Sequence, residues 1–340
     1  MELTDRKILV TGASGALGSA VVEELVARNC PPVCHVRENS NTTRIDELGL
    51  EKRVADIRDR PALLRLMEGI DGVIHTAALV SFQGDRLTQF TGVNVMGAAD
   101  MYEAARREGV RRFVHVSTVA AVGARPLSDA PVGAPSLDPL TEEHEFNLDH
   151  LRIPYIMTKR AAELELIQAR QANQDAPELI MVNPSIIISE ATGRSPDSRM
   201  SRYFKRHLVP DFSNIVNLVD IRDVAPGVVA ALEQGRPGQR YILAGDNLPA
   251  RDLVLTVSNM IGRTPHLVRI PRPLINLAAR VSATLARLRG QGRLEFYPDL
   301  VGLLDYDWSF SSEKARQELG FQARSIYHTL TDLLSKEKEA

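Results

Sequence analysis

Tyr155 and Lys159 stand four positions apart, at the start of a helical pattern that runs towards Gln171. Side chains at this spacing lie on one face of a helix. A phenol has an ordinary pKa of ~10 and exchanges protons slowly at neutral pH, but a neighbouring ammonium, together with a positively charged ring in a bound cofactor, favours the phenolate. Thr118 ends a β-branched run and supplies a hydroxyl that can orient the same substrate oxygen. These three residues predict proton exchange between Tyr155 and a carbonyl or alcohol.

A glycine-rich turn follows the first apolar strand and opens the first helical pattern. Such a turn lets a pyrophosphate approach the backbone and lie at the helix N-terminus. The glycine spacing alone is weak, and its place between a strand and a helix is what the mechanism requires. The residues expected to contact a dinucleotide here are Gly12, Ser14, Gly15, Ala16, Leu17 and Gly18.

The end of the second strand reads Val36-Arg37-Glu38, where an NAD site would carry an acid for the adenosine-ribose 2′-hydroxyl. Arg37 takes that place, and a guanidinium suits a 2′-phosphate, with Arg44 as a second cation. The sequence therefore favours NADP(H) over NAD(H). The alternative is a solvated surface arginine, because Glu38 is adjacent and strand registers are uncertain by ~2 residues.

Further dinucleotide contacts are expected after the third and fourth strands. Asp56 and Ile57 end the third strand, where the carboxylate can lie near an adenine amino group, and Asp59 caps the next helix. An acid at such a junction is also explained as a helix cap. The fourth strand closes with small side chains that let the backbone lie against the dinucleotide. Those residues are Thr76, Ala77 and Ala78, preceded by His75, which we expect to be structural, as is His115 in the core.

The elements that must position these residues are short β-branched runs that alternate with helical patterns. Strands apolar on both faces, joined by crossover helices, predict a doubly wound parallel sheet, the Rossmann α/β fold. Thr118 then lies at the carboxyl edge of the sheet, where ligands bind in such folds. The predicted strands are Lys7–Thr11, Pro32–Arg37, Arg53–Asp56, Gly72–Thr76, Arg112–Thr118 and Glu178–Pro184.

After about Ser185 this regularity breaks. We predict that residues 1–185 form an NAD(P)-binding domain whose sheet is continued by parts of 215–245, and that residues 186–340 are mostly a smaller, interleaved α/β substrate region. The apolar and basic pattern of Leu274–Leu288 favours a buried amphipathic helix over a membrane-surface helix. Other predicted elements are the helices Asp220–Glu233, Arg251–Ile261 and Ser311–Leu319 and the strand Gln239–Leu243.

Composition excludes several classes of protein. Lys plus Arg number 41 against 43 Asp plus Glu, a formal net charge of −2, so no nucleic-acid partner is expected. No apolar run approaches the ~18–20 residues of a membrane span. The two cysteines, Cys30 and Cys34, suggest free thiols, and the first residues lack a basic, apolar leader, so we expect a cytoplasmic protein. The acidic run around His144 is interpreted as a solvated loop, and no metal site is predicted.

Several motifs follow one another along the chain, in the order TGASGALG, Asp56, HTAA, the Asn94-Val95 pair, VSTVAAVG and YIMTK. Through these motifs the chain resembles the extended short-chain dehydrogenase/reductase family, also described as the NAD(P)-dependent epimerase/dehydratase family. The likeness covers nearly the whole chain. The strings HTAALV, VDIRDVAPGVVAAL and WSFSSEKARQELGF are similar to the branch that holds dihydroflavonol reductases, 3β-hydroxysteroid dehydrogenases and related nucleotide-sugar epimerases.

The resemblance implies a role for each matching residue. Asn94 is structural or relays protons, Pro184 lies against the nicotinamide, and Val116 contacts the cofactor. Family members dimerise through the helices near Asp85–Glu108 and Tyr155–Gln171, which implies a homodimer. The chain departs from the family's Gly-Pro-Gly stretch after the sixth strand, so the substrate lid is not inferred. The implied catalytic residues are Thr118, Tyr155 and Lys159, of which Tyr155 and Lys159 also contact the cofactor.

These observations favour an NADP(H)-dependent oxidoreductase that interconverts a secondary alcohol and a ketone or aldehyde, with a small-molecule substrate. One alternative is a nucleotide-sugar epimerase or dehydratase with tightly bound NAD, against which Arg37 argues. Another is a non-catalytic dinucleotide-sensing protein, against which the intact Thr118, Tyr155 and Lys159 set argues. The substrate itself is not identified, because the least regular segments, among them the loop after Ala78 and Ser185–Ile215, build its pocket.

Overall fold

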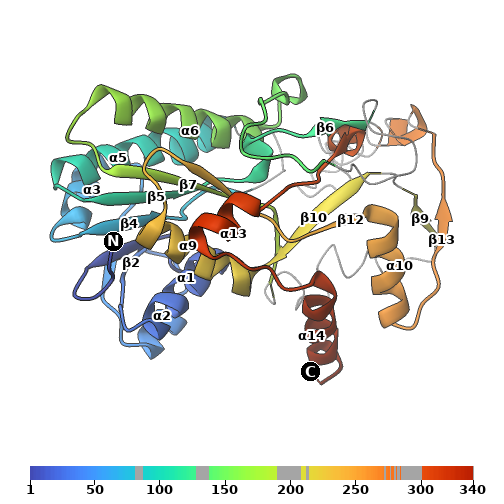
Figure 1. Cartoon of the computed structure of the whole chain (residues 1–340), viewed down its shortest axis with the longest axis horizontal. Helices are drawn as coiled ribbons and strands as arrows, with labels where there is room; N and C mark the ends of the chain where they lie inside the picture. The colour runs from blue at the N-terminus through green and yellow to red at the C-terminus, as the bar shows by residue number, and fades with distance from the viewer. Residues whose placement is uncertain are drawn as a thin grey trace.

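The computed structural model contains a seven-stranded, wholly parallel sheet in the order β11-β7-β5-β4-β1-β2-β3 (Figure 1). The structure describes residues 1–80, 87–127, 138–189, 208–211, 214–271, 273–275, 277–278, 281, 284 and 301–339. All seven strands match predicted ones within two residues at each end. They are β1 (Ile8–Thr11), β2 (Val33–Val36), β3 (Lys52–Val54), β4 (Gly72–His75), β5 (Arg112–Val116), β7 (Glu178–Pro184) and β11 (Arg240–Leu243).

Helices cover both faces of this sheet, as strands apolar on both faces require. Along β1, Ile8 and Val10 pack into one core and Leu9 packs into the other. The first face is covered by α1 (Ala16–Ala27), α9 (Ile221–Gln234) and α13 (Glu313–Leu319), and the second by α3 (Arg60–Met67), α5 (Gly97–Arg107) and α6 (Pro154–Ala172) (Figure 1). The predicted doubly wound fold is confirmed.

Short elements join these layers. The predicted cap of α3 is present, since the Asp59 carboxylate accepts a hydrogen bond from the backbone N–H of Ala62. The connecting elements are α2 (Thr43–Glu47), α4 (Leu87–Phe90), the π-helix η1 (Thr91–Met96), the 3-10 helices η2 (Val119–Ala121), η4 (Asp149–Leu151) and η5 (Gly302–Asp305), and the two-residue strands β6 (Arg125–Pro126) and β14 (Tyr306–Asp307), which pair with each other.

A three-stranded sheet lies beyond the carboxyl end of β7. Its strands are β8 (Ile186–Ile188), β10 (Ile215–Asp220) and β12 (Asp246–Pro249), with β10 in the centre, parallel to β8 and antiparallel to β12. The helices α10 (Ala250–Met260) and α14 (Ile326–Glu339) share a hydrophobic core with it, and β9 (Leu208–Pro210) pairs with β13 (His266–Val268). The division at residue 185 stays a prediction.

Several sequence expectations concern what is absent. In the described part of the chain, no helix is long and apolar enough to cross a bilayer, and no group of three or more His, Cys, Asp or Glu side chains is placed to hold a metal ion. Cys30 and Cys34 are buried and free. The expected helix Leu274–Leu288 lies largely outside the described residues.

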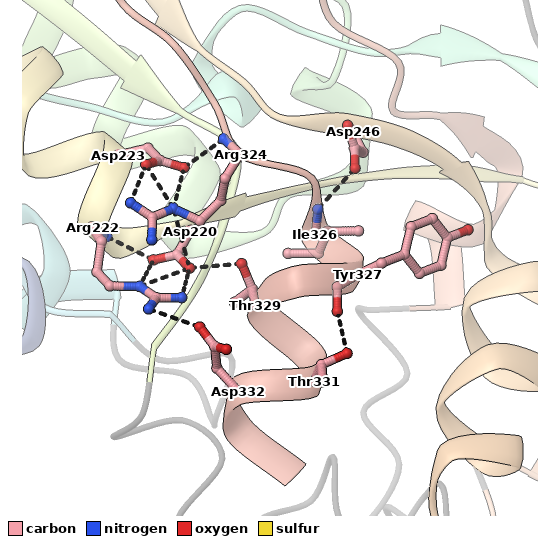
Figure 2. Close-up of polar contacts among 10 residues, drawn as sticks. All are labelled: Asp220, Arg222, Asp223, Asp246, Arg324, Ile326, Tyr327, Thr329, Thr331 and Asp332. Atoms are coloured by element: carbon pink, nitrogen blue, oxygen red, sulfur yellow. Dashed lines mark hydrogen bonds and ion pairs between the residues drawn. The ribbon is translucent and has the colours of Figure 1, made fainter. Parts of the chain in front are cut away.

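The C-terminal helix α14 is fixed to the start of α9 by the carboxylate of Asp220 (Figure 2). Asp220 ends β10, is almost fully buried, and caps α9 by accepting a hydrogen bond of 2.8 Å from the Arg222 backbone N–H. The Arg222 guanidinium donates to both oxygens of this carboxylate, and the Thr329 hydroxyl of α14 donates to one of them at 2.6 Å. One buried carboxylate therefore joins three elements.

The segment before α14 is held by two more carboxylates (Figure 2). The backbone N–H and the guanidinium Nε of Arg324 both donate to Asp223 at 2.8 Å. Asp246, at the start of β12, accepts the backbone N–H of Ile326 at 2.8 Å and so satisfies a free donor at the start of α14. These contacts attach the start of the C-terminal helix to α9 and to the three-stranded sheet.

We expect Asp220→Asn to lower the free energy of unfolding by ~2–3 kcal/mol, the range for losing charge-assisted hydrogen bonds in a buried position. Burial raises the pKa of Asp220, but hydrogen bonds from Arg222 and Thr329 outweigh burial and leave that pKa below its ordinary value. The stabilisation is therefore full above the unfolded value of ~3.9 and is lost as pH falls through the folded pKa. Urea unfolding from pH 7 to pH 3 measures this.

The matched control is Asp332→Asn, because Asp332 also pairs with Arg222 but is half exposed. That change should cost less than ~1 kcal/mol. Equal losses in the two variants, or a loss at Asp220 that persists unchanged at pH 3, would contradict the role given to the buried carboxylate.

Candidate active site

The glycine turn brings β1, α1 and the end of β4 into direct contact. Gly12 has a φ of +66°, a conformation that favours glycine. A Cβ on Gly18 would lie 2.1 Å from the Gly12 carbonyl oxygen, so only glycine fits there. The Thr76 hydroxyl donates to the Thr11 carbonyl at 2.6 Å, and the Ala77 N–H donates to the Thr11 hydroxyl at 3.2 Å. The turn is a backbone cradle, and the structure brings its predicted residues together with Thr76 and Ala77.

The N-terminus of α1 suits an anionic group. Gly15 occupies the N-cap position and offers no side chain to cap the helix, and the first turn carries no acidic residue. Ser14, Gly15 and Ala16 are exposed at this end. Free backbone N–H groups and the positive end of the helix dipole favour a pyrophosphate. These residues fit the pyrophosphate of a dinucleotide.

A cavity of about 390 Å³ lies at the ends of β2 and β3. Its lining includes Arg37 and Asp56, so the structure brings these two predicted residues together. Hydrogen bonds from the Arg58 side chain, and then from its backbone, lower the pKa of Asp56 to about 2, so this carboxylate is ionised at neutral pH. The full lining is Arg37, Glu38, Asn39, Val54, Ala55 and Asp56.

Two predicted residues at this end of the site have side chains that make contacts within the chain, and their contacts with a dinucleotide stay predictions. Arg44, expected as a second cation beside Arg37, pairs with Glu23 and Glu47, because α2 lies next to α1. The Ile57 side chain is buried in the core under α5, which leaves its backbone as the part that can face a dinucleotide.

The three residues expected to do chemistry meet at the carboxyl end of β5. Thr118 caps the 3-10 helix η2, its hydroxyl accepting the Ala120 N–H at 3.3 Å, and the same hydroxyl is hydrogen-bonded to the Tyr155 phenol. Tyr155 lies in the first turn of α6. One turn later, the buried Lys159 ammonium donates to the Val116 carbonyl at 2.6 Å, two residues before Thr118. The predicted set is therefore assembled.

The protonation states are those of the chain without a coenzyme, so the expected ease of forming the phenolate beside an oxidised coenzyme stays a prediction. Burial raises the pKa of Tyr155 to about 12, although the hydrogen bond with Thr118 acts to lower it. Burial, opposed by the Glu163 carboxylate, lowers the pKa of Lys159 to about 8. The ammonium is held at the Val116 carbonyl, so the chain alone does not stabilise a phenolate. At neutral pH Tyr155 is a protonated phenol, which is the form that a proton donor needs.

Asn94 connects the loop after β4 to α6. Its Oδ1 accepts the Leu79 N–H at 2.7 Å, and its Nδ2 donates to the Leu79 carbonyl at 3.1 Å and to the Thr158 hydroxyl at 3.2 Å. These bonds favour the structural reading of Asn94 over the proton relay. Asn94 lies in the π-helix η1, a distortion that often marks functional sites and that the sequence analysis missed.

Four more residues lie at the carboxyl edge of the large sheet or just inside it, namely Pro184, Val116, His75 and His115. Pro184 ends β7, beside the strand that carries Val116. The rings of His75 and His115 stack with centroids 5.5 Å apart. Burial lowers the pKa of His75 to about 3 and that of His115 well below its ordinary value, so both are neutral core residues as expected. The His115 ring nitrogens have no hydrogen-bond partner among the described residues.

Sequence reasoning missed three side chains beside this edge, namely Glu163, Asn183 and Arg240. Glu163 is fully buried in α6, four residues after Lys159. A charged residue one turn from a predicted catalytic lysine, next to Ala161 and Ala162, was the signal that could have found it. The segments expected to build the substrate pocket lie largely outside the described residues.

A seven-stranded doubly wound sheet with a glycine cradle and a Thr-Tyr-Lys set at one edge defines a dinucleotide-dependent enzyme of the Rossmann type. Residues 8–244 match the model of the NAD dependent epimerase/dehydratase family. The chain therefore belongs to this family, the extended short-chain dehydrogenases/reductases, whose members use a nicotinamide dinucleotide on small molecules.

Two relatives match over nearly their whole length. The chain is 29% identical to the sterol demethylase protein B of Methylococcus capsulatus, over 97% of this chain and 98% of that protein. It is also 29% identical to a putative dihydroflavonol 4-reductase of Synechocystis sp., over 95% of this chain and 92% of that protein. The family and these relatives indicate an oxidoreductase enzyme.

Solved structures share the fold. The crystal structure of gox2253 superposes with a TM-score of 0.80 at 29% identity, covering 98% of both chains. The UDP-glucose 4-epimerase of Thermus thermophilus, solved in complex with NAD, gives a TM-score of 0.70 at 19% identity and covers 98% of this chain and 99% of its own. At that identity the second likeness extends to the fold alone.

Proposed function

We propose that this chain is an NADP(H)-dependent oxidoreductase that interconverts a ketone or aldehyde and the corresponding alcohol. The observation that carries the proposal is the hydrogen bond between the Thr118 hydroxyl and the Tyr155 phenol, with Lys159 one helical turn away. Two hydroxyl groups at one point on the ligand-binding edge are suited to a single substrate oxygen.

The chain's own residues would act as follows during reduction. The Tyr155 phenol, protonated at neutral pH, donates its proton to the carbonyl oxygen as negative charge develops there. The Thr118 hydroxyl donates a second hydrogen bond and fixes the position of that oxygen. Lys159 holds the end of β5 through Val116 and adds positive charge near the reacting oxygen. The bound nicotinamide coenzyme supplies the hydride.

The coenzyme would lie along the carboxyl edge. The backbone of the Gly12–Gly18 turn and the N-terminus of α1 would hold the pyrophosphate, and the cavity lined by Arg37 and Asp56 would hold the adenosine. Arg37 supports NADP(H) because a guanidinium forms charge-assisted hydrogen bonds with a 2′-phosphate. Pro184 and Lys159 would lie at the nicotinamide end.

The second candidate function is a nucleotide-sugar epimerase or dehydratase that keeps NAD bound. The family description and the shared fold of the Thermus thermophilus epimerase support it. The two candidates separate on purification. An oxidoreductase turns over added NADPH on a panel of carbonyl compounds, whereas an epimerase retains NAD through gel filtration and leaves added NADPH unused.

Tyr155→Phe should lower kcat by ~10²–10⁴ while coenzyme affinity is kept, because only the proton-transferring oxygen is lost. Lys159→Met should lower kcat and weaken coenzyme binding. Thr118→Ala should be nearly inactive and Thr118→Ser should keep most activity, because only the hydroxyl is needed. Stopped-flow oxidation of NADPH, with a carbonyl substrate found in the panel, measures all four.

Tyr102→Phe is the matched control, because its buried phenol donates to the Pro177 carbonyl away from the site. It should lose ~1 kcal/mol of stability and keep the parent kcat. A folded Tyr155→Phe variant that reduces substrate at the parent rate would remove Tyr155 as the acid.

Arg37→Asp should weaken NADPH binding by roughly a hundredfold and affect NADH far less, because a phosphate contact is replaced by repulsion between a carboxylate and the 2′-phosphate. Fluorescence titration with both coenzymes measures the two dissociation constants. Arg44→Asp is the control, since Arg44 is engaged with Glu23 and Glu47. If NADPH affinity is unchanged and NADH binding is impaired, the preference proposed here is wrong.

We also propose a homodimer formed through α4, η1 and α6. Large apolar side chains are exposed on these neighbouring helices, with Leu87 at 50%, Met96 at 53% and Leu164 at 43%. Leu164→Glu should convert a dimer into a particle near the chain mass of 37.5 kDa in light scattering, because a carboxylate would be buried at the interface. Ile186→Glu, at an apolar site of similar exposure on β8, should stay dimeric. A parent protein that is monomeric at micromolar concentration would refute the assembly.

A further inference from the structure

We propose that Glu163 is a positioning residue of this active site, which holds the backbone at Thr118 through Asn183 and supplies the negative charge beside Lys159. The inference rests on the proposed oxidoreductase function, because it assigns to Glu163 the placement of the residues that carry that function. No step of the mechanism above uses Glu163.

The link to Thr118 runs through one side-chain amide. The Nδ2 of Asn183, on β7, donates to Glu163 Oε1 at 2.7 Å and to the Thr118 carbonyl at 2.9 Å. Both side chains are fully buried. An amide nitrogen has two hydrogens, so these two bonds use both of them and fix the amide plane. Glu163 thus fixes the Asn183 side-chain amide, and this amide in turn binds the Thr118 carbonyl.

The other carboxylate oxygen faces cations. Arg240, on the edge strand β11, donates to Glu163 Oε2, and Arg160 lies 3.4 Å from the same oxygen. A buried ion pair is costly to desolvate, and apolar residues of similar volume often serve stability as well or better. Stability alone therefore gives little reason to place a carboxylate here, whereas a positioning role does.

Glu163 is also the acidic group that acts on Lys159. The Lys159 charge also acts on His75 of β4 and His115 of β5, and both histidines are neutral. The Glu163 charge favours the protonated amine and opposes the effect of burial. Without it, the pKa of Lys159 falls below its present value of about 8.

The two effects converge on the last residues of β5. Lys159 holds the Val116 carbonyl at 2.6 Å and Asn183 holds the Thr118 carbonyl at 2.9 Å, so the strand end is fixed at two points two residues apart. Glu163 supports both points, the first through charge and the second through Asn183. The Thr118 hydroxyl can meet the Tyr155 phenol only if this backbone stays in place.

Glu163→Gln tests the charge. The rate of carbonyl reduction should fall at high pH as Lys159 loses its proton and no longer adds positive charge near the reacting oxygen, and removing the Glu163 charge lowers the pKa of Lys159. We expect this alkaline limb to move to lower pH by about one unit. Glu163→Asp keeps the charge, so its alkaline limb should lie at the pH found for the parent enzyme. The matched control is Glu165→Gln, the same change at an exposed position of α6, which should leave the profile unchanged.

Asn183→Ala tests the link to the backbone. It removes the amide that joins Glu163 to Thr118 and leaves the pairing of Glu163 with Arg240 intact. We expect plateau kcat to fall about tenfold, which corresponds to ~1.4 kcal/mol, while the alkaline limb and the coenzyme dissociation constant stay at parent values. If Asn183 were purely structural, Asn183→Ala would lower the melting temperature. Plateau kcat would then not fall while the alkaline limb stays at the pH of the parent enzyme. If Glu163→Gln does not fold, Asn183→Ala and Glu163→Asp still decide the proposal.

The pKa of Lys159 supplies a readout that needs no substrate. NMR titration of protein labelled at lysine Cε, assigned with Lys159→Met, should show a lower pKa in Glu163→Gln and the parent pKa in Glu165→Gln. If the parent enzyme reduces carbonyl compounds and neither the Lys159 pKa nor the alkaline limb moves in Glu163→Gln, and kcat is unchanged in Asn183→Ala, the positioning role is overturned. If the Lys159 pKa moves as expected and no carbonyl compound is reduced, the proposed function fails and the charge coupling stands.

Discussion

Parallel pairing in a single register is the constraint on which the site depends. Thr11 pairs with His75, His75 with His115, and His115 with Met181, so four strands reach the carboxyl edge at the same level. Whatever follows each of these residues is therefore placed along one line. The glycine turn follows Thr11, Ala77 follows β4, Thr118 follows β5, and Asn183 and Pro184 end β7. A slip of one residue in any pair would turn these side chains to the opposite face.

The sequence predicted the parts of this edge that have a local signal. Apolar runs followed by turns located the seven strands of the large sheet, and the glycines at 12, 15 and 18 located the cradle. Asp59 was predicted as a helix cap because capping depends on neighbours along the chain. The Tyr155–Lys159 spacing placed both residues on α6 for the same reason. Periodicity and capping act over a few residues, so a single sequence is enough to predict them.

Other features depend on residues brought together from distant segments, and these were missed. Glu163, Asn183 and Arg240 come from α6, β7 and β11, and no spacing along the chain relates them. The ion pair of Arg44 with Glu23 joins α2 to α1, and no spacing along the chain predicts it. Burial of the Tyr155 phenol, which raises its pKa in the chain alone, also follows from packing and not from a local pattern. Each of these outcomes is set by packing, which a local pattern does not encode.

The same edge also connects the chemistry to the segments that would select a substrate. The chain leaves Pro184 at the end of β7 and enters β8 within two residues, and β8 pairs with β10. At the end of β10, Asp220 caps α9, which packs on the large sheet, and binds Thr329 of α14, which packs on the small one (Figure 2). The short connection from Pro184 to β8 and the contacts of Asp220 therefore both join the small sheet to the large one. The strand and the helix that carry Thr118, Tyr155 and Lys159 are held by the side-chain hydrogen bonds of Asn94, Asn183 and Glu163. The support for these three side chains therefore comes from buried groups on η1, β7 and α6, which are parts of the large sheet and of the helical layer over it.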